Sequence, residues 1–186
     1  MRIELPEEYQ ASPSEHLARV YPSEIVKAAQ TFGPSPYQYS KLSLRELEAA
    51  RYRTALINGC NVCMNFRGAR DFPAMFAIFD GDLENSVYTR GPAPDEDFYQ
   101  NVTNWRDYPD YSERERLAIR YAEGMGLAPQ EIARDEDFWA RARAVFSDEE
   151  LVDMTYSIAA WMGLGRAQHV LGLDAACTFA PMEKAI

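Results

Sequence analysis

Two of the three cysteines lie three residues apart, in the segment Cys60-Asn61-Val62-Cys63, and their thiols are the side chains best placed for chemistry. Residues at this spacing on a helix are one turn apart, close enough for a disulfide with modest adjustment. The pair follows Gly59, and we expect it to open a helix whose free N–H groups stabilise a thiolate. A thiolate beside a second thiol suits disulfide exchange and peroxide reduction, in which one sulfur attacks and the other resolves.

The same spacing occurs in zinc sites and in buried pairs that only pack. A zinc site needs a second pair of ligands, and the remaining candidates, which are not paired in the sequence, are His16, His169 and Cys177. A lone helical histidine such as His169 is usually a satisfied core or surface residue, and Cys177 is interpreted as an incidental thiol. We therefore expect no metal and no cofactor, and we favour redox chemistry over packing.

Two charged residues flank the pair. Glu48 lies on the apolar stripe of the helix expected before it, where a carboxylate must find partners or hold a proton. An ion pair with Arg51 or Arg53 is one interpretation of Glu48, and a general base for a thiol is the other, which the nearby cysteines favour. Arg67 follows Cys63 by four residues, on the same face of the expected helix. Its guanidinium would favour a thiolate without shuttling protons, although an ordinary salt bridge is equally compatible.

Helix signals cover most of the chain and position these side chains. We expect a first helix over 14–32 and a second from a Ser43–Glu46 capping box to Asn58-Gly59. A third starts near Cys60 and meets Pro73, which should end or kink it. Further helices are expected from a Ser112–Glu115 capping box to about Gly126, over 138–146, and from a Ser147–Glu150 capping box onward, the last with an interruption at Gly163 and Gly165. Residues 85–110, which contain Gly91-Pro92, are predicted to form a long loop or lid. No alternating apolar run is present, so the predicted fold class is all-α.

Two segments, 43–71 and 147–175, look like copies of one helical hairpin. Their matching residues are Ser43/Ser147, Glu46/Glu150, Leu47/Leu151, Tyr52/Tyr156, Ala55/Ala159, Gly59/Gly163 and Gly68/Gly172. Cys60 and Cys63 align with Leu164 and Ala167, so only the first copy carries the thiols. We favour a duplication, although capping boxes and glycine breaks are common enough to explain part of the match.

Composition narrows the possible partners. The 186 residues fit one domain spanning 1–186, and 47% of them are hydrophobic. A formal net charge of −10 disfavours nucleic acid and anionic membranes as partners. No run approaches the roughly 20 apolar residues of a membrane span, and the charged, proline-containing N-terminus does not resemble a signal peptide. We therefore expect a cytoplasmic protein, in which a close cysteine pair serves redox or metal chemistry more often than structure.

Taken together, these residues resemble the carboxymuconolactone decarboxylase superfamily, in particular its alkylhydroperoxidase D-like branch. The pattern of that branch is a glutamate, eleven residues, CxxC, three residues and a histidine. Glu48, Cys60 and Cys63 match it in type and spacing, within RELEAARYRTALINGCNVCMNF, and the resemblance extends over about 42–172. Arg67 stands where that branch has its histidine. The resemblance implies an all-helical fold with an internally repeated hairpin, assembled as a homo-oligomer, a trimer or a hexamer.

The resemblance also implies roles. Cys63 would attack a small peroxide or disulfide substrate, Cys60 would resolve it by closing a Cys60–Cys63 disulfide, and Glu48 would act as the base. A lipoyl group or a thioredoxin-like protein would then restore the thiols. Two alternatives stay open: a non-catalytic or redox-sensing helical oligomer that has lost the relay, and a lyase of the decarboxylase branch acting on a small carboxylate held by Arg67.

Overall fold

The computed structural model describes residues 1–76 and 81–175, apart from the side chains of Glu15 and Met75. Within these ranges the chain forms helices and turns and contains no β-strand, which confirms the predicted all-α class. No helix among the described residues is both long and apolar enough to cross a membrane. Cys177 lies outside the described residues, so its interpretation as an incidental thiol stays a prediction.

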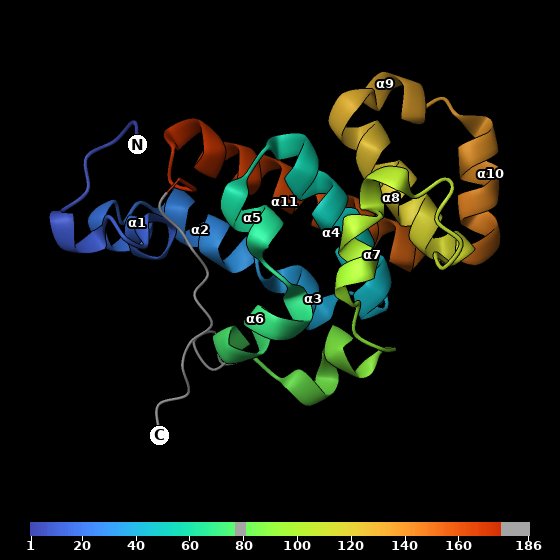
Figure 1. The fold of residues 1–186 in the computed structure, drawn as a ribbon, viewed down its shortest axis with the longest axis horizontal. Coiled ribbons are helices and arrows are strands. Elements are labelled where there is room, and N and C mark those ends of the chain that lie inside the picture. Colours follow the sequence, from blue (N-terminus) through green and yellow to red (C-terminus); the bar gives the residue numbers. More distant parts are fainter. Residues whose placement is uncertain (77–80, 176–186) are drawn as a thin grey trace.

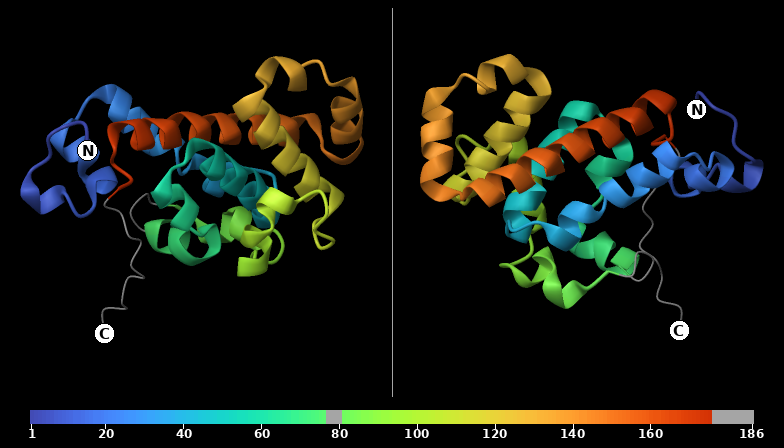
Figure 2. Two further views of the ribbon diagram at one scale, coloured as in Figure 1. Left: turned by 45° about the horizontal axis from the view of Figure 1, so that its top comes forward. Right: turned by 180° about the vertical axis from the view of Figure 1, so that it is seen from behind.

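The core is built around α4 (Leu44–Asn58), which packs against α8 (Glu113–Leu127) and α11 (Asp148–Leu171) (Figure 1). Small, fully buried side chains let these helices approach closely: Ala49, Ala50, Ala118 and Ala122. Figure 2 shows α11 as the long helix that runs from the α8–α10 end of the molecule to the end that carries α1 and α2. The cysteine pair follows directly after α4, so the most extensively packed helix positions it.

The N-terminal helix predicted over 14–32 is wrong, because the chain forms two helices there. They are α1 (Pro13–Val20) and α2 (Glu24–Phe32), preceded by the short turn η1 (Glu7–Tyr9) and followed by α3 (Ser35–Tyr39). Pro22 disfavours helical backbone at Tyr21, and the Ser23 side chain then caps α2 by accepting from the N–H of Val26.

The helix predicted from Cys60 to Pro73 is also divided in two. It becomes α5 (Asn61–Asn65) and α6 (Gly68–Phe76), and Pro73, which was expected to end or kink the helix, lies inside α6. The break at residues 66–67 has tertiary and local causes, because the Asp71 carboxylate accepts the N–H of Arg67 at 2.7 Å and the Glu48 carboxylate accepts that of Gly68 at 3.0 Å. These N–H groups find acceptors outside the helical ladder, so α6 starts anew.

The loop or lid predicted over residues 85–110 contains short helical turns separated by irregular residues. The helical turns in and next to it are η2 (Leu83–Asn85), η3 (Val87–Thr89), α7 (Glu96–Gln100) and η4 (Val102–Asn104). Val87, Phe98, Tyr99 and Val102 are buried, so this segment is part of the core. Its glycine and prolines limit the length of each helix without preventing the aromatic side chains from packing.

The second half of the chain confirms two capping boxes and corrects one break. The boxes open α8 at Ser112 and α11 at Ser147, with the short α9 (Pro129–Ile132) and α10 (Glu136–Val145) between these helices. The predicted interruption at Gly163 and Gly165 is wrong, since α11 continues through both glycines to Leu171. An interior glycine costs about 1 kcal/mol, which tertiary packing of a long helix offsets. The two segments of the proposed duplication therefore share a capping box and a first helix, but not the glycine break that follows.

Candidate redox site

Cys60 and Cys63 form a disulfide across the start of α5, with their Cα atoms 5.2 Å apart. Cys60 is the N-cap residue of α5, and its sulfur accepts the N–H of Cys63 at 3.3 Å. The two cysteines differ in exposure, because Cys60 is completely buried and Cys63 is partly exposed. A molecule arriving from solvent therefore meets Cys63 and not Cys60. With only five residues, α5 offers one turn of free N–H groups instead of the longer helix that the sequence predicted.

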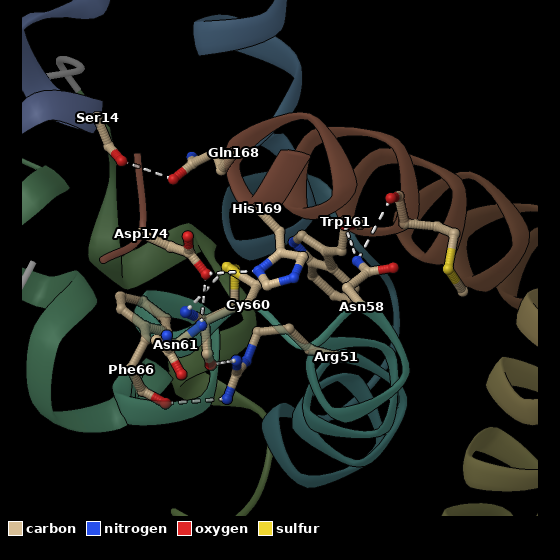
Figure 3. The surroundings of a disulfide bond; sticks show 12 residues. Ser14, Arg51, Asn58, Cys60, Asn61, Phe66, Trp161, Gln168, His169 and Asp174 are labelled. Carbon is tan, nitrogen blue, oxygen red and sulfur yellow. Dashed lines mark hydrogen bonds and ion pairs between the residues drawn. A yellow bond between two sulfur atoms is a disulfide. The ribbon is translucent and has the colours of Figure 1, made fainter. Parts of the chain in front are cut away.

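The turn that carries the disulfide is fixed against α11. As predicted, α4 ends at Asn58, and Gly59 is its C-cap residue. The Asn58 amide donates to the carbonyl oxygens of Trp161 and Met162 at 3.0 and 3.3 Å (Figure 3). A Cβ atom on Gly165 would lie 2.6 Å from Asn58 Nδ2, which is too close, and 3.6 Å from Cys63 Sγ, which is an ordinary contact distance. The Asn58 amide therefore leaves no room for a side chain at position 165.

Glu48 lies behind the disulfide, wholly buried, in a cage of hydrogen-bond donors. Its carboxylate accepts from the hydroxyls of Tyr37 and Tyr99, and from the backbone N–H of Gly68 at 3.0 Å. Arg51 adds two further bonds, through Nε at 2.6 Å and Nη2 at 3.0 Å. Because an ionised carboxylate offers about four lone-pair sites, these donors occupy it fully. The structure thus contains the predicted Glu48–Arg51 ion pair.

The protonation state of this cage follows from its partners. Burial alone would raise the pKa of Glu48, but the Arg51 charge and the hydrogen bonds from Arg51, Tyr37 and Tyr99 hold that pKa below its ordinary value. The pKa of Tyr37 is raised, by burial first and then by the Glu48 charge, and the same causes raise that of Tyr99. The cage therefore consists of a carboxylate, a guanidinium and two neutral phenols.

Arg51 connects this cage to the cysteines. Its Nη1 donates to the carbonyl oxygen of Cys63 at 2.7 Å, and its Nη2 donates to that of Phe66 at 3.0 Å (Figure 3). Gly68 closes the other side, where an added Cβ would lie 2.8 Å from Glu48 Oε1. The buried ion pair thus holds the C-terminal half of α5 at a fixed position relative to α4. The second candidate partner of Glu48, Arg53, pairs with Glu123 instead.

Arg67 does not share a helix with Cys63, which corrects the predicted common face, because α5 ends at Asn65. Its guanidinium pairs with the Glu96 carboxylate at 2.9 Å and donates to the carbonyl oxygens of Met64 and Phe66. The Arg67 guanidinium carbon also lies 4.2 Å from the centre of the Tyr99 ring. These contacts attach α7 and Tyr99 to the end of α5. They match the interpretation of Arg67 as a salt-bridge residue.

A histidine–carboxylate pair adjoins the disulfide from the opposite side (Figure 3). His169, in the last turn of α11, lies with Nδ1 2.9 Å from Asp174 Oδ2, which also accepts the N–H of Asn61 at 3.0 Å. A Cβ on Gly59 would lie 3.7 Å from His169 Nε2. The sequence prediction treated His169 as an ordinary histidine. It also missed Tyr37 and Tyr99 as partners of Glu48, because no local pattern connects residues so far apart.

Comparison with known proteins supports the fold. No family model matches the chain, and no curated protein sequence matches it. Among solved structures it is similar to ATU0492 from Agrobacterium tumefaciens, described as a protein of unknown function and a candidate antioxidant defence protein AhpD. The two are 26% identical with a TM-score of 0.61, over 84% of this chain and 92% of that one. The chain thus has an AhpD-like helical fold, and the Cys60–Cys63 disulfide within it indicates a redox role.

Among residues 1–76 and 81–175, no group of three histidine, cysteine, aspartate or glutamate side chains is arranged to hold a metal ion.

Proposed function

We propose that the chain is a thiol-dependent antioxidant oxidoreductase that reduces small peroxides or exchanges disulfides through Cys60 and Cys63. The observation that carries this proposal is the asymmetric disulfide, in which a partly exposed Cys63 is joined to a completely buried Cys60 within an AhpD-like fold. An exposed thiol is able to meet a substrate, and a buried partner is protected from competing oxidation while it resolves the first product.

In the proposed cycle the Cys63 thiolate attacks one oxygen of a peroxide, and the O–O bond breaks. Cys63 becomes a sulfenic acid, and the leaving alkoxide or hydroxide takes up a proton as an alcohol or water. The Cys60 thiolate then attacks the Cys63 sulfur and displaces hydroxide, which is protonated to water as the disulfide forms. A dithiol donor, of the lipoyl or thioredoxin-like kind, returns two electrons and two protons through a mixed disulfide with Cys63.

Glu48 enters this proposal as the anchor of the turn. A role as base was predicted from the sequence, but its lowered pKa and fully occupied oxygens support a fixed charge that holds Arg51, and through it the Cys63 and Phe66 carbonyls. The pairing of Arg67 with Glu96 likewise supports a structural role over the binding of a small carboxylate, and so disfavours the lyase alternative.

Assembly as a homo-oligomer, a trimer or hexamer, remains part of the proposal, as do a cytoplasmic location and the absence of nucleic-acid partners. The support for subunit contacts is an apolar surface between α3 and α11, where Tyr39, Val152 and Tyr156 are more than half exposed and line one hollow. Exposed apolar side chains gathered in one place are typical of protein interfaces.

Peroxide consumption with dihydrolipoamide as the donor tests the proposal, using the wild type, Cys63→Ser and Cys60→Ser. We expect the wild type to consume peroxide repeatedly and Cys63→Ser to consume none. Cys60→Ser should consume one peroxide per chain and stop, because the resolving thiol is missing. A wild-type rate no greater than that of free cysteine would contradict the enzyme proposal. If the disulfide still formed and opened reversibly in that case, the redox-sensor alternative would take its place.

A further inference from the structure

We propose that His169 and Asp174 are the acid–base pair of this site and that they act on Cys60, with His169 exchanging the proton and Asp174 positioning the imidazole. The inference rests on the proposed thiol chemistry and assigns a proton-transfer role that neither Glu48 nor Arg67 fills. It is carried by the contacts of His169 and Asp174 with the peptide segment 59–61, which bring the pair next to the residues before and after Cys60.

The pair lies against the residues directly before and after Cys60. Asp174 accepts the N–H of Asn61, the residue after Cys60, at 3.0 Å. On the other side, the position of a Cβ on Gly59, the residue before Cys60, is 3.7 Å from His169 Nε2. His169 and Asp174 also bind each other at 2.9 Å. The imidazole is therefore held against the turn from which the Cys60 side chain projects, as the close-up in Figure 3 shows.

The tautomer of His169 follows from Asp174. Burial would raise the pKa of Asp174, but hydrogen bonds from His169 and from the Asn61 backbone lower it, so the carboxylate is ionised. An ionised carboxylate only accepts hydrogen bonds, and His169 Nδ1 must therefore carry the proton. This leaves Nε2, on the side of Gly59, with a lone pair that accepts a proton from a thiol. A carboxylate, an imidazole and a nucleophile in this order follow the logic of hydrolase triads.

Cys60 needs such a partner because it is completely buried. Burial disfavours the thiolate, yet Cys60 must be a thiolate to attack the Cys63 sulfenic acid and must leave as a thiolate when a donor opens the disulfide. The Glu48 carboxylate is occupied by five donors, and an arginine keeps its proton. The His169 side chain is 50% exposed, so its imidazole exchanges protons with water.

His169 takes one proton from Cys60 during resolution and returns one proton to it during reduction. During resolution, His169 takes the proton of the Cys60 thiol, the Cys60 sulfur bonds to Cys63, and hydroxide leaves to be protonated as water. During reduction, a donor thiolate bonds to Cys63, the S–S bond breaks, and the Cys60 sulfur receives the proton of the His169 imidazolium. A second donor thiolate then releases Cys63 and leaves as an oxidised donor disulfide.

Other charged groups also face this region and bear on its pH dependence. Asp174 lies after α11, the Glu48–Arg51 pair comes from α4, and the backbone of Met1 packs against Gly172. Of these, Arg51 and Glu48 keep their charges near neutral pH, as does Asp174. Histidine is the residue type among them that takes up and releases a proton most readily near neutral pH.

Direct titration of Cys60 tests the inference without peroxide turnover. In a Cys63→Ser, Cys177→Ser background, Cys60 is the single thiol, and its ultraviolet thiolate absorbance gives its ionisation curve. We expect His169→Gln to lower the thiolate fraction near neutral pH about tenfold, which corresponds to one pKa unit. Asp174→Asn, which keeps an acceptor for Asn61, should act in the same direction but less strongly. His16→Gln, a change of the second histidine in the chain, should leave the curve unchanged.

A second readout follows the opening of the disulfide by dithiothreitol at different pH values in proteins with both cysteines. We expect His169→Gln to slow this reaction about tenfold or more below neutral pH, where the imidazolium donates. An unchanged Cys60 titration together with an unchanged pH profile in folded His169→Gln would overturn the inference, even if the wild type reduces peroxide. A wild type that fails to consume peroxide but shows both effects would overturn the peroxidase proposal and leave the acid–base assignment standing.

Discussion

The helices α4 and α11 begin alike and end differently, and the site lies where they diverge. Each opens with a serine–glutamate capping box, but α4 stops at Gly59 and the chain turns through the disulfide, whereas α11 continues past Gly163 and Gly165. The break in one helix creates a turn that exposes Cys63 and buries Cys60. The continuation of the other brings His169 to that turn. The early end of α4 therefore supplies the turn that carries the disulfide, and the longer α11 supplies the helix that packs over it.

The same contrast separates the two polar clusters beside the disulfide. On the α4 side, Glu48 and Arg51 are a fully buried and fully hydrogen-bonded ion pair, suited to fixing backbone positions. On the α11 side, His169 and Asp174 combine a half-exposed imidazole with a buried carboxylate, suited to moving protons. A charged carboxylate is not necessarily a base. When all of its lone pairs accept hydrogen bonds, as in Glu48, taking up a proton costs it several of these interactions.

The largest effect is expected from breaking the buried pair. Glu48→Gln leaves the Arg51 charge uncompensated in the core, and we expect the free energy of unfolding to fall by about 3 to 5 kcal/mol. Urea unfolding of the oxidised protein measures this. The control is Glu113→Gln, which removes an exposed ion pair with Arg141 and should cost less than about 1 kcal/mol. Equal losses in the two variants would contradict the anchoring role of Glu48.

The pH dependence of the stability lost in Glu48→Gln tests whether Glu48 is a fixed charge or a base. The pKa of Glu48 is lower in the folded chain than in the unfolded chain, so the unfolded chain binds more protons as the solution is acidified. The stability that Glu48 contributes is therefore complete above its unfolded pKa of about 4.3 and is lost as the pH falls through the folded pKa. Urea unfolding at several pH values should show a constant difference between wild type and Glu48→Gln from neutral pH down to about 5. A difference that shrinks already near neutrality would indicate a base.

A pair of glycine substitutions tests the close passage of α11. A Cβ on Gly165 would displace the Asn58 amide from its two carbonyl partners, so we expect Gly165→Ala to destabilise the protein by about 1 to 3 kcal/mol. Gly163 has nothing within 4 Å of an added Cβ, and Gly163→Ala should stabilise the helix by about 0.5 to 1 kcal/mol. Thermal unfolding of both variants measures these changes, and the same sign in both would refute the packing account.

The smallest effect is expected at Arg67. Arg67→His places the residue of the alkylhydroperoxidase D-like pattern at its usual position and removes the ion pair with the exposed Glu96, at a cost of about 1 kcal/mol or less. Because His169 already serves Cys60 in this account, we expect the rate of peroxide consumption to stay within a few-fold of the wild type. A gain of a hundredfold or more would show that the relay belongs at position 67 and that α11 does not replace it.

Several local signals in the sequence predicted the structure correctly. The capping boxes of α4, α8 and α11, the stop at Gly59 and the spacing of Cys60 and Cys63 are such signals, and all are present in the structure. The break between α5 and α6 could not be predicted, because one of the two acceptors that determine it, Glu48, lies on α4. The meeting of His169 and Asp174 with Asn61 likewise joins residues more than a hundred positions apart, which no periodicity reports.

The most direct test of the account asks which sulfur a peroxide oxidises. One equivalent of hydrogen peroxide is added to reduced Cys60→Ser and reduced Cys63→Ser, both with Cys177→Ser, and sulfenic acid is trapped with dimedone and located by mass spectrometry. We predict a trapped sulfenic acid on Cys63 in the first protein and almost none on Cys60 in the second. Trapping on Cys60 with Cys63 unmodified would contradict the assignment of attacking and resolving thiols that the unequal burial of the two cysteines supports.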